Sequence, residues 1–201
     1  MNIMINYRDF FQLEADPKKD DYLLTLTLKK NMRGIIYKIT AILFAHGWDI
    51  IEANFETDED GNVKDLFHVR SFKNEVLDEP SLEEIRKDVE DLFFRDLLVI
   101  DYLDRFPDLT LVSPTKISPV IRLFNPDSVD STVLDIRTID RPGLLFEISQ
   151  LLYLLDIDIL SVTAKTEEKM VRDTFLLRRE MTERLDENMM KKLNEGLEKI
   201  L

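Results

Sequence analysis

Two stretches of the chain decide the fold: GIIYKITAILFAHGWDIIEANFET at residues 34–57 and GLLFEISQLLYLLDIDILSVTAKT at residues 143–166. They align without a gap, and each begins with glycine and ends with threonine. Beyond them, VKDLFHVR in the first copy aligns with MVRDTFLLR in the second once the first copy's turn is allowed one extra residue. Because a repeat at domain spacing decides the architecture before local propensities do, the chain is predicted to hold two copies of one small fold.

The two copies carry the same succession of hydrophobic patterns. Before each glycine, apolar residues alternate with polar ones, which is the period of a half-buried strand. After each glycine, apolar residues recur at helical spacing and form one face of a helix. A strand with one polar face follows, then a third strand, with a hairpin signal at Asp60-Gly61 in the first copy. The alternating positions are Leu24, Leu26 and Leu28, or Leu134 and Ile136, and the helical positions are Ile35, Ile39, Ile42 and Leu43, or Leu144, Ile148, Leu151, Leu152 and Leu155.

A second amphipathic helix closes each copy, and in the first copy Pro80 with a capping box at Ser81 and Glu84 marks its start. The resulting order β-α-β-β-α is typical of the split β-α-β, ferredoxin-like arrangement. The segment LLVIDYL at 97–103 is predicted to supply the final strand of the first copy, and VIRLFN at 120–125 a further strand. The residues before about Asp20 receive no assignment.

Length and repeat together predict two domains. The 201 residues suit two compact domains of about 100 residues each. We place the first at residues 1–112, with an N-terminal extension, and the second at residues 113–201. The turn formers of FPDLTLVSPTKISP, which span this boundary, indicate a linker. The fold class is therefore α+β, with two ferredoxin-like (βαββαβ) domains in tandem.

Composition excludes several classes of partner and chemistry. The formal net charge of -13 would repel a phosphate backbone or an anionic membrane, so neither nucleic acid nor membrane is an expected partner. The absence of cysteine excludes disulfides, thiolate metal sites and a cysteine nucleophile. The start of the chain lacks the basic and apolar regions of a leader peptide, and no apolar run reaches about 18 residues. We therefore expect a cytoplasmic protein.

The run Asp140-Arg141-Pro142-Gly143-Leu144-Leu145, followed by Ile159 and the Asp173-Thr174-Phe175 strand, resembles an ACT domain. The resemblance is to the tandem ACT type found at the C-terminus of bacterial bifunctional uridylyltransferases. It covers the second half and, more weakly, the first, where the loop reads Asn31-Met32-Arg33-Gly34 and lacks both the proline and the aspartate. It implies a regulatory module that binds an amino acid, with glutamine as one candidate, and that pairs with further copies. The uridylyltransferase catalytic motifs have no counterpart in this sequence.

The strand–glycine–helix junction has physical content of its own. A helix start leaves backbone N–H groups unpaired, and a residue without Cβ lets a ligand approach the chain closely, so a carboxylate could bind there. Asp140, or Asn31 in the first copy, could accept hydrogen bonds from the ligand's ammonium group. The alternative is that Gly143 only connects two elements and Asp140 only caps the helix. The candidate ligand-binding residues are Asp140, Arg141, Pro142, Gly143, Leu144 and Leu145, with Asn31, Met32, Arg33, Gly34 and Ile35.

Other candidates have simpler explanations. His46 and His68 have no nucleophile or metal ligand at a recognisable spacing, so each is interpreted as an ordinary histidine. Asp49 and Asp158 occupy equivalent places in the two repeats, which favours a shared role in a turn. The acidic run from Glu56 resembles the opening of a calcium loop but lacks its final glutamate. No catalytic residue, metal site or cofactor is therefore predicted.

Three hypotheses for function remain open. The favoured one is a tandem-domain sensor in which a bound amino acid, at a domain interface, changes the packing of the domains. The second is a protein–protein interaction or dimerisation module with no small ligand, and exposed sheet edges lead us to expect a homodimer in either case. The third, an enzyme using Asp140 and Asp173 as acid and base, is disfavoured because no partnered nucleophile accompanies them.

Overall fold

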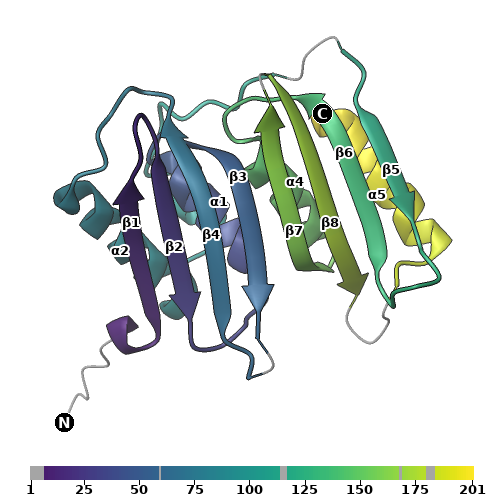
Figure 1. Cartoon of the computed structure of the whole chain (residues 1–201), viewed down its shortest axis with the longest axis horizontal. Coiled ribbons are helices and arrows are strands. Elements are labelled where there is room, and N and C mark those ends of the chain that lie inside the picture. The colour runs from purple at the N-terminus through teal and green to yellow at the C-terminus, as the bar shows by residue number, and fades with distance from the viewer. Residues whose placement is uncertain (1–6, 59, 114–116, 168, 180–183) are drawn as a thin grey trace.

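A computed structural model of the chain describes residues 7–58, 60–113, 117–167, 169–179 and 184–201. In this part of the chain, eight strands form one antiparallel sheet in the order β1-β2-β4-β3-β7-β8-β6-β5, and the helices lie behind it in the view of Figure 1. The strands are β1 Phe11–Pro17, β2 Tyr22–Leu28, β3 Trp48–Thr57, β4 Val63–Ser71, β5 Val120–Phe124, β6 Thr132–Ile139, β7 Ile157–Glu167 and β8 Met170–Arg179. The helices are the 3-10 turn η1 Tyr7–Asp9, α1 Ile35–Ala45, α2 Glu79–Phe94, α3 Val99–Leu103, α4 Leu144–Leu154 and α5 Glu187–Ile200.

The two repeats fold alike and join side by side into one sheet. Each half contributes four strands, and the halves meet where β3 pairs with β7 over three residue pairs centred on Ala53 and Ala164. Behind this seam α1 packs against α4, and the buried hydroxyls of Thr40 and Ser149 lie 3.0 Å apart across the contact. The tandem ferredoxin-like fold predicted from the repeat is confirmed.

The edge strand of the first half was predicted in the wrong place. Residues 99–103 of the LLVIDYL segment form helix α3, with Val99 and Tyr102 buried and Ile100 exposed, a spacing of three rather than two. The edge position beside β2 is taken instead by β1, which pairs with it from Phe11 to Pro17. Each half thus runs β-β-α-β-β-α, with its edge strand at the beginning. The strand predicted at 120–125 is present as β5 and plays the same part in the second half.

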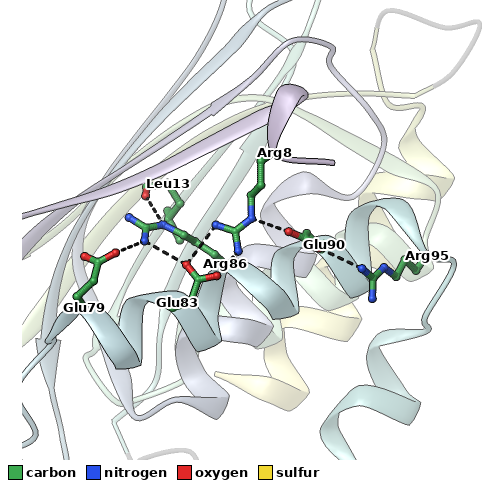
Figure 2. Close-up of polar contacts among 7 residues, drawn as sticks. All are labelled: Arg8, Leu13, Glu79, Glu83, Arg86, Glu90 and Arg95. Atoms are coloured by element: carbon green, nitrogen blue, oxygen red, sulfur yellow. Dashed lines mark hydrogen bonds and ion pairs between the residues drawn. The ribbon is translucent and has the colours of Figure 1, made fainter. Parts of the chain in front are cut away.

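A series of ion pairs, drawn in Figure 2, binds the N-terminal segment to α2. Arg8 binds Glu83 and Glu90 on α2, each at 2.5 Å. Arg86, from α2, binds Glu79 and donates a hydrogen bond of 3.0 Å from Nε to the carbonyl oxygen of Leu13 on β1. These contacts hold the edge strand and the helix behind it together.

The second helix of each half is capped by an aspartate. Asp78 accepts a 2.9 Å hydrogen bond from the backbone N–H of Ser81, so α2 begins earlier than the predicted capping box at Ser81 and Glu84. Asp186 accepts the equivalent bond from Met189 at the start of α5. Within the described residues, no helix combines the length and the apolar character needed to cross a membrane.

Candidate functional site

Both glycine junctions adopt the conformation that favours glycine. Gly34 and Gly143 precede α1 and α4 with φ of 78° and 82°, in the left-handed region, and neither helix start has a side-chain cap. A Cβ on Gly34 would lie 2.7 Å from the ring of Tyr153, and one on Gly143 would lie 2.8 Å from the ring of Phe44. Each glycine therefore faces an aromatic ring of the other half, so each loop forms part of a site that both halves build.

The first loop opens onto a cavity of about 350 Å³, which we call site 1. Its volume lies at the small end of the range for ligand pockets. The first half supplies the loop, the start of α1 and residues of β3 and β4, and the second half supplies residues of α4, β7 and β8. The lining residues are Asn31, Met32, Arg33, Gly34, Ile35, Ile36, Tyr37, Phe55, Thr57, Val63, Asp65, Ser149, Tyr153, Asp156, Ile157, Asp158, Ile159, Leu160 and Arg178.

Strand geometry explains why there is room between the halves. Strands β3 and β7 pair only over residues 52–54 and 163–165. The register of β3 shifts at Ile51 and that of β7 shifts at Leu160, and both residues line cavities at the seam. A bulge bends its strand, so the two strands part on either side of their short pairing. Two gaps result, one beside each glycine loop.

Charged groups of both signs line site 1. Arg33 is engaged, because it forms an ion pair with Asp156, donates a 3.1 Å hydrogen bond to the carbonyl oxygen of Tyr153 and lies over the Tyr153 ring. The carboxylates of Asp65 and Asp158 and the guanidinium of Arg178 also line the cavity. The Asn31 amide lies 3.4 Å from the Thr57 hydroxyl. Site 1 therefore offers acceptors for an ammonium group and donors for a carboxylate.

The second loop borders a much smaller cavity, of about 20 Å³, which we call site 2. Its residues are the repeat equivalents of those in site 1, and two of them carry larger side chains: Trp48 stands where site 1 has Ile157, and Arg141 where it has Met32. Arg141 is 5% exposed, forms an ion pair with Glu147 and donates a 2.6 Å hydrogen bond to the carbonyl oxygen of Ile200. The Arg141 side chain is therefore held in place by Glu147 and the end of α5.

Site 2 contains three carboxyls, of which Asp173 is buried and Asp49 and Asp140 are half-buried. Burial, followed by the nearby charge of Asp140, raises the pKa of Asp49 to about 7. Burial likewise raises the pKa of Asp173 to about 7, again with a smaller contribution from Asp140. Burial also raises the pKa of Asp140 itself. One carboxyl oxygen of Asp173, which is 4% exposed, has no hydrogen-bond partner. The cause is the same for all three, because exclusion of water disfavours the charged form of a carboxyl.

The predicted site residues divide between the two cavities. Site 1 is lined by the first-copy candidates Asn31, Met32, Arg33, Gly34 and Ile35, and site 2 by Asp140, Arg141, Gly143, Leu144 and Leu145, whereas Pro142 lines neither. The second-copy loop, which carries the stronger family resemblance, thus borders the smaller cavity.

Sequence reasoning missed the residues that each half contributes to the other's site. In site 1 these include Asp158 and Arg178, from β7 and β8 of the second half. Asp49 and Asp158, interpreted as turn residues, each line a cavity. The repeat alignment carries a signal for them, since it pairs Asp49 with Asp158 and Arg70 with Arg178.

The two histidines lie beside carboxylates. His46 Nε2 lies 2.7 Å from Asp88, which also accepts a 2.8 Å hydrogen bond from the hydroxyl of Tyr102. His68 lies 3.4 Å from Asp21. Neither histidine lines site 1 or site 2. Among the described residues, no group of three or more histidine, aspartate or glutamate side chains is placed to hold a metal ion.

The fold and its paired interface sites define the class of this protein: two ferredoxin-like domains in tandem, with a cavity beside each glycine loop. Comparison with models of known protein families gives no match. In sequence, the chain is similar to the bifunctional uridylyltransferase/uridylyl-removing enzyme of Rhodospirillum rubrum, with 28% identity over 149 residues. This confirms the resemblance inferred from the loop motif. The match covers 72% of this chain but 16% of that enzyme, so the chain spans a small part of its relative's length.

Solved structures show a weaker likeness. The chain is similar to aspartate kinase from Synechocystis with a TM-score of 0.47 and 14% identity, over 90% of this chain and 26% of that one.

Proposed function

We propose that this protein is a non-catalytic regulatory module that binds one amino acid in site 1 and signals through the packing of its two halves. Residues 1–112 and 113–201 are the two domains in this proposal, and the cytoplasm is its compartment. Glutamine is one candidate ligand, by the similarity to the uridylyltransferase.

The observation that carries the proposal is that site 1 belongs to both halves. Its loop, from Asn31 to Gly34, comes from the first half, and the wall from Asp156 to Leu160 comes from the second. A ligand that contacts both walls binds one relative arrangement of the halves more tightly than another. Binding energy is thereby coupled to packing, which is what a regulatory domain needs.

The chemistry of site 1 suits a zwitterion. The start of α1 presents backbone N–H groups and the positive end of the helix dipole to a carboxylate. Asp65 and Asp158 place carboxylates in the same cavity, where an ammonium group would be bound. Apolar surface comes from Phe55, and the Tyr37 and Tyr153 rings stack with their centroids 4.9 Å apart. Charged ends and an apolar wall together fit a molecule of amino-acid size.

The test is thermal melting of the purified chain against each of the twenty amino acids at millimolar concentration. A ligand present at a hundred times its dissociation constant stabilises by about 2.7 kcal/mol, which raises the melting temperature of a protein this size by roughly 5–10 °C. The variant Thr57→Trp, which fills site 1 from an exposed position, should remove the shift. The matched variant Thr166→Trp, at the equivalent position of site 2, should retain it.

Melting temperatures unchanged by every amino acid would contradict the proposal and favour the interaction module. One observation supports that alternative: β5 forms an outer edge of the sheet and carries Val120 and Phe124, which are 49% and 44% exposed. Such an edge can pair with another chain. A homodimer stays a prediction.

A further inference from the structure

Two arginines at equivalent places of the repeat are in opposite situations. Arg70 on β4 lies across from Asp49, and Arg178 on β8 lies across from Asp158. Arg70 donates hydrogen bonds of 2.8 and 3.2 Å to the two carboxylate oxygens of Asp21. The side chain of Arg178, in contrast, forms no hydrogen bond or ion pair with any residue that the structure describes. One guanidinium of the pair therefore already holds a carboxylate, and the other does not.

A single residue difference accounts for this contrast. Tyr22 pairs with Val69 and Thr132 pairs with Leu177, the residues directly before the two arginines. The residue before Tyr22 is Asp21, whereas the residue before Thr132 is Ser131. A serine hydroxyl carries no charge and cannot neutralise a guanidinium, so the second half lacks the carboxylate that occupies its counterpart.

The position of each arginine side chain depends on whether a carboxylate binds it. Arg70, bound to Asp21, does not line site 2, whereas Arg178 lines site 1. The other arginine at site 1, Arg33, is already bound to Asp156. Of the described cationic groups that line site 1, Arg178 is thus the one left for an anionic group of a ligand.

We propose that Arg178 binds the carboxylate of the site 1 ligand, as Arg70 binds the carboxylate of Asp21. The inference rests on the proposed function and specifies it: the ligand is a free carboxylic acid, and the second half holds its anionic end by charge-assisted hydrogen bonds. A guanidinium binds a carboxylate through two parallel N–H donors. A carboxamide or an ester cannot accept hydrogen bonds in this way, so neither can replace the carboxylate. Arg178 thereby links the ligand held by the first half's loop to β8 of the second half.

The experiment compares four proteins by thermal melting and calorimetric titration: wild type, Arg178→Gln, Arg70→Gln and Ser131→Asp. The probes are the twenty L-amino acids and the carboxamide of the one that shifts the wild type most. Arg178→Gln should weaken binding of that amino acid at least tenfold, and Arg70→Gln should change it less than threefold. Ser131→Asp should weaken it as well, because the new carboxylate takes the place of the ligand's. The carboxamide should bind wild type at least tenfold less tightly than the acid.

The outcomes separate this inference from the function on which it rests. If no amino acid binds the wild type, both are refuted. If an amino acid binds but Arg178→Gln binds it as tightly as wild type does, or the carboxamide binds as well as the acid, only the role of Arg178 is refuted. Melting without ligand checks that each variant folds, which we expect for Arg178→Gln because the side chain is exposed and has no partner in the described residues.

Discussion

Replacing Asp173 with asparagine should change how the stability of the protein depends on pH. The carboxyl is 4% exposed, and burial raises its pKa from 3.8 to about 7. Between about pH 4 and pH 7 the unfolded chain releases a proton that the folded protein keeps, so the folded protein loses stability as the pH rises. Below that window both states are protonated, and above it the loss is complete.

The magnitude follows from the difference between the two pKa values. Folding raises the pKa of Asp173 by about three units, and each unit corresponds to about 1.36 kcal/mol. Wild type therefore loses up to about 4 kcal/mol of unfolding free energy through this group. Asparagine has the same shape and no charge, so Asp173→Asn should lack this loss. Relative to wild type, the variant should gain about 2–4 kcal/mol between about pH 4.5 and about pH 8.5, whatever the constant effect of the new amide group.

Urea denaturation followed by circular dichroism, at several pH values across this window, measures the effect. Asp78→Asn is the control, because hydrogen bonds from Ser81 lower the pKa of Asp78 and its contribution to stability is lost in the other direction, as the pH falls. That variant should keep the wild-type loss above pH 4. The argument from burial would be refuted if the difference in unfolding free energy between Asp173→Asn and wild type changed by less than about 0.5 kcal/mol across the window.

Two further substitutions test other parts of the structure. Gly34→Ala should destabilise the protein by about 1–3 kcal/mol, since the new Cβ would lie 2.7 Å from the Tyr153 ring. Gly61→Ala is the control: Gly61 has a similar φ of 82°, but a Cβ there would have no atom within 4 Å, so it should cost less in the same thermal melts. Arg86→Met should cost about 1–2 kcal/mol by removing the hydrogen bond to Leu13 and the ion pairs with Glu79 and Glu83, and the cost should shrink in high salt. A cost for Arg86→Met that did not change with salt would show that its ion pairs contribute nothing.

The sequence predicted the repeated part of the fold well, because that part is recorded twice. The helix from Ile35 and the strand after it were supported by matching periods in both copies, and both are present. The edge strand was misassigned because LLVIDYL is apolar enough for either structure. Its true conformation depends on β1, a partner distant in sequence, which already occupies the edge beside β2.

Only the glycine loop of the candidate site was predicted. The glycine loop is a local feature, so Gly34 and its neighbours could be identified from the chain alone. Asp158 and Arg178 reach site 1 only because β3 and β7 join the halves in one sheet, and no local pattern encodes that pairing. The size of each cavity was equally hidden, since it depends on which side chains of the two halves meet there, such as Trp48 in site 2 and Ile157 in site 1.

The seam between β3 and β7 has an evolutionary consequence. If two identical chains met in this way, the two cavities would be identical by symmetry, and every mutation would alter both. Here both partners are parts of one polypeptide, so the contact does not weaken on dilution and each side mutates independently. A change such as tryptophan for isoleucine, or arginine for methionine, can then close one cavity while the other keeps its opening. One cavity is thus free to specialise in packing and the other in recognition.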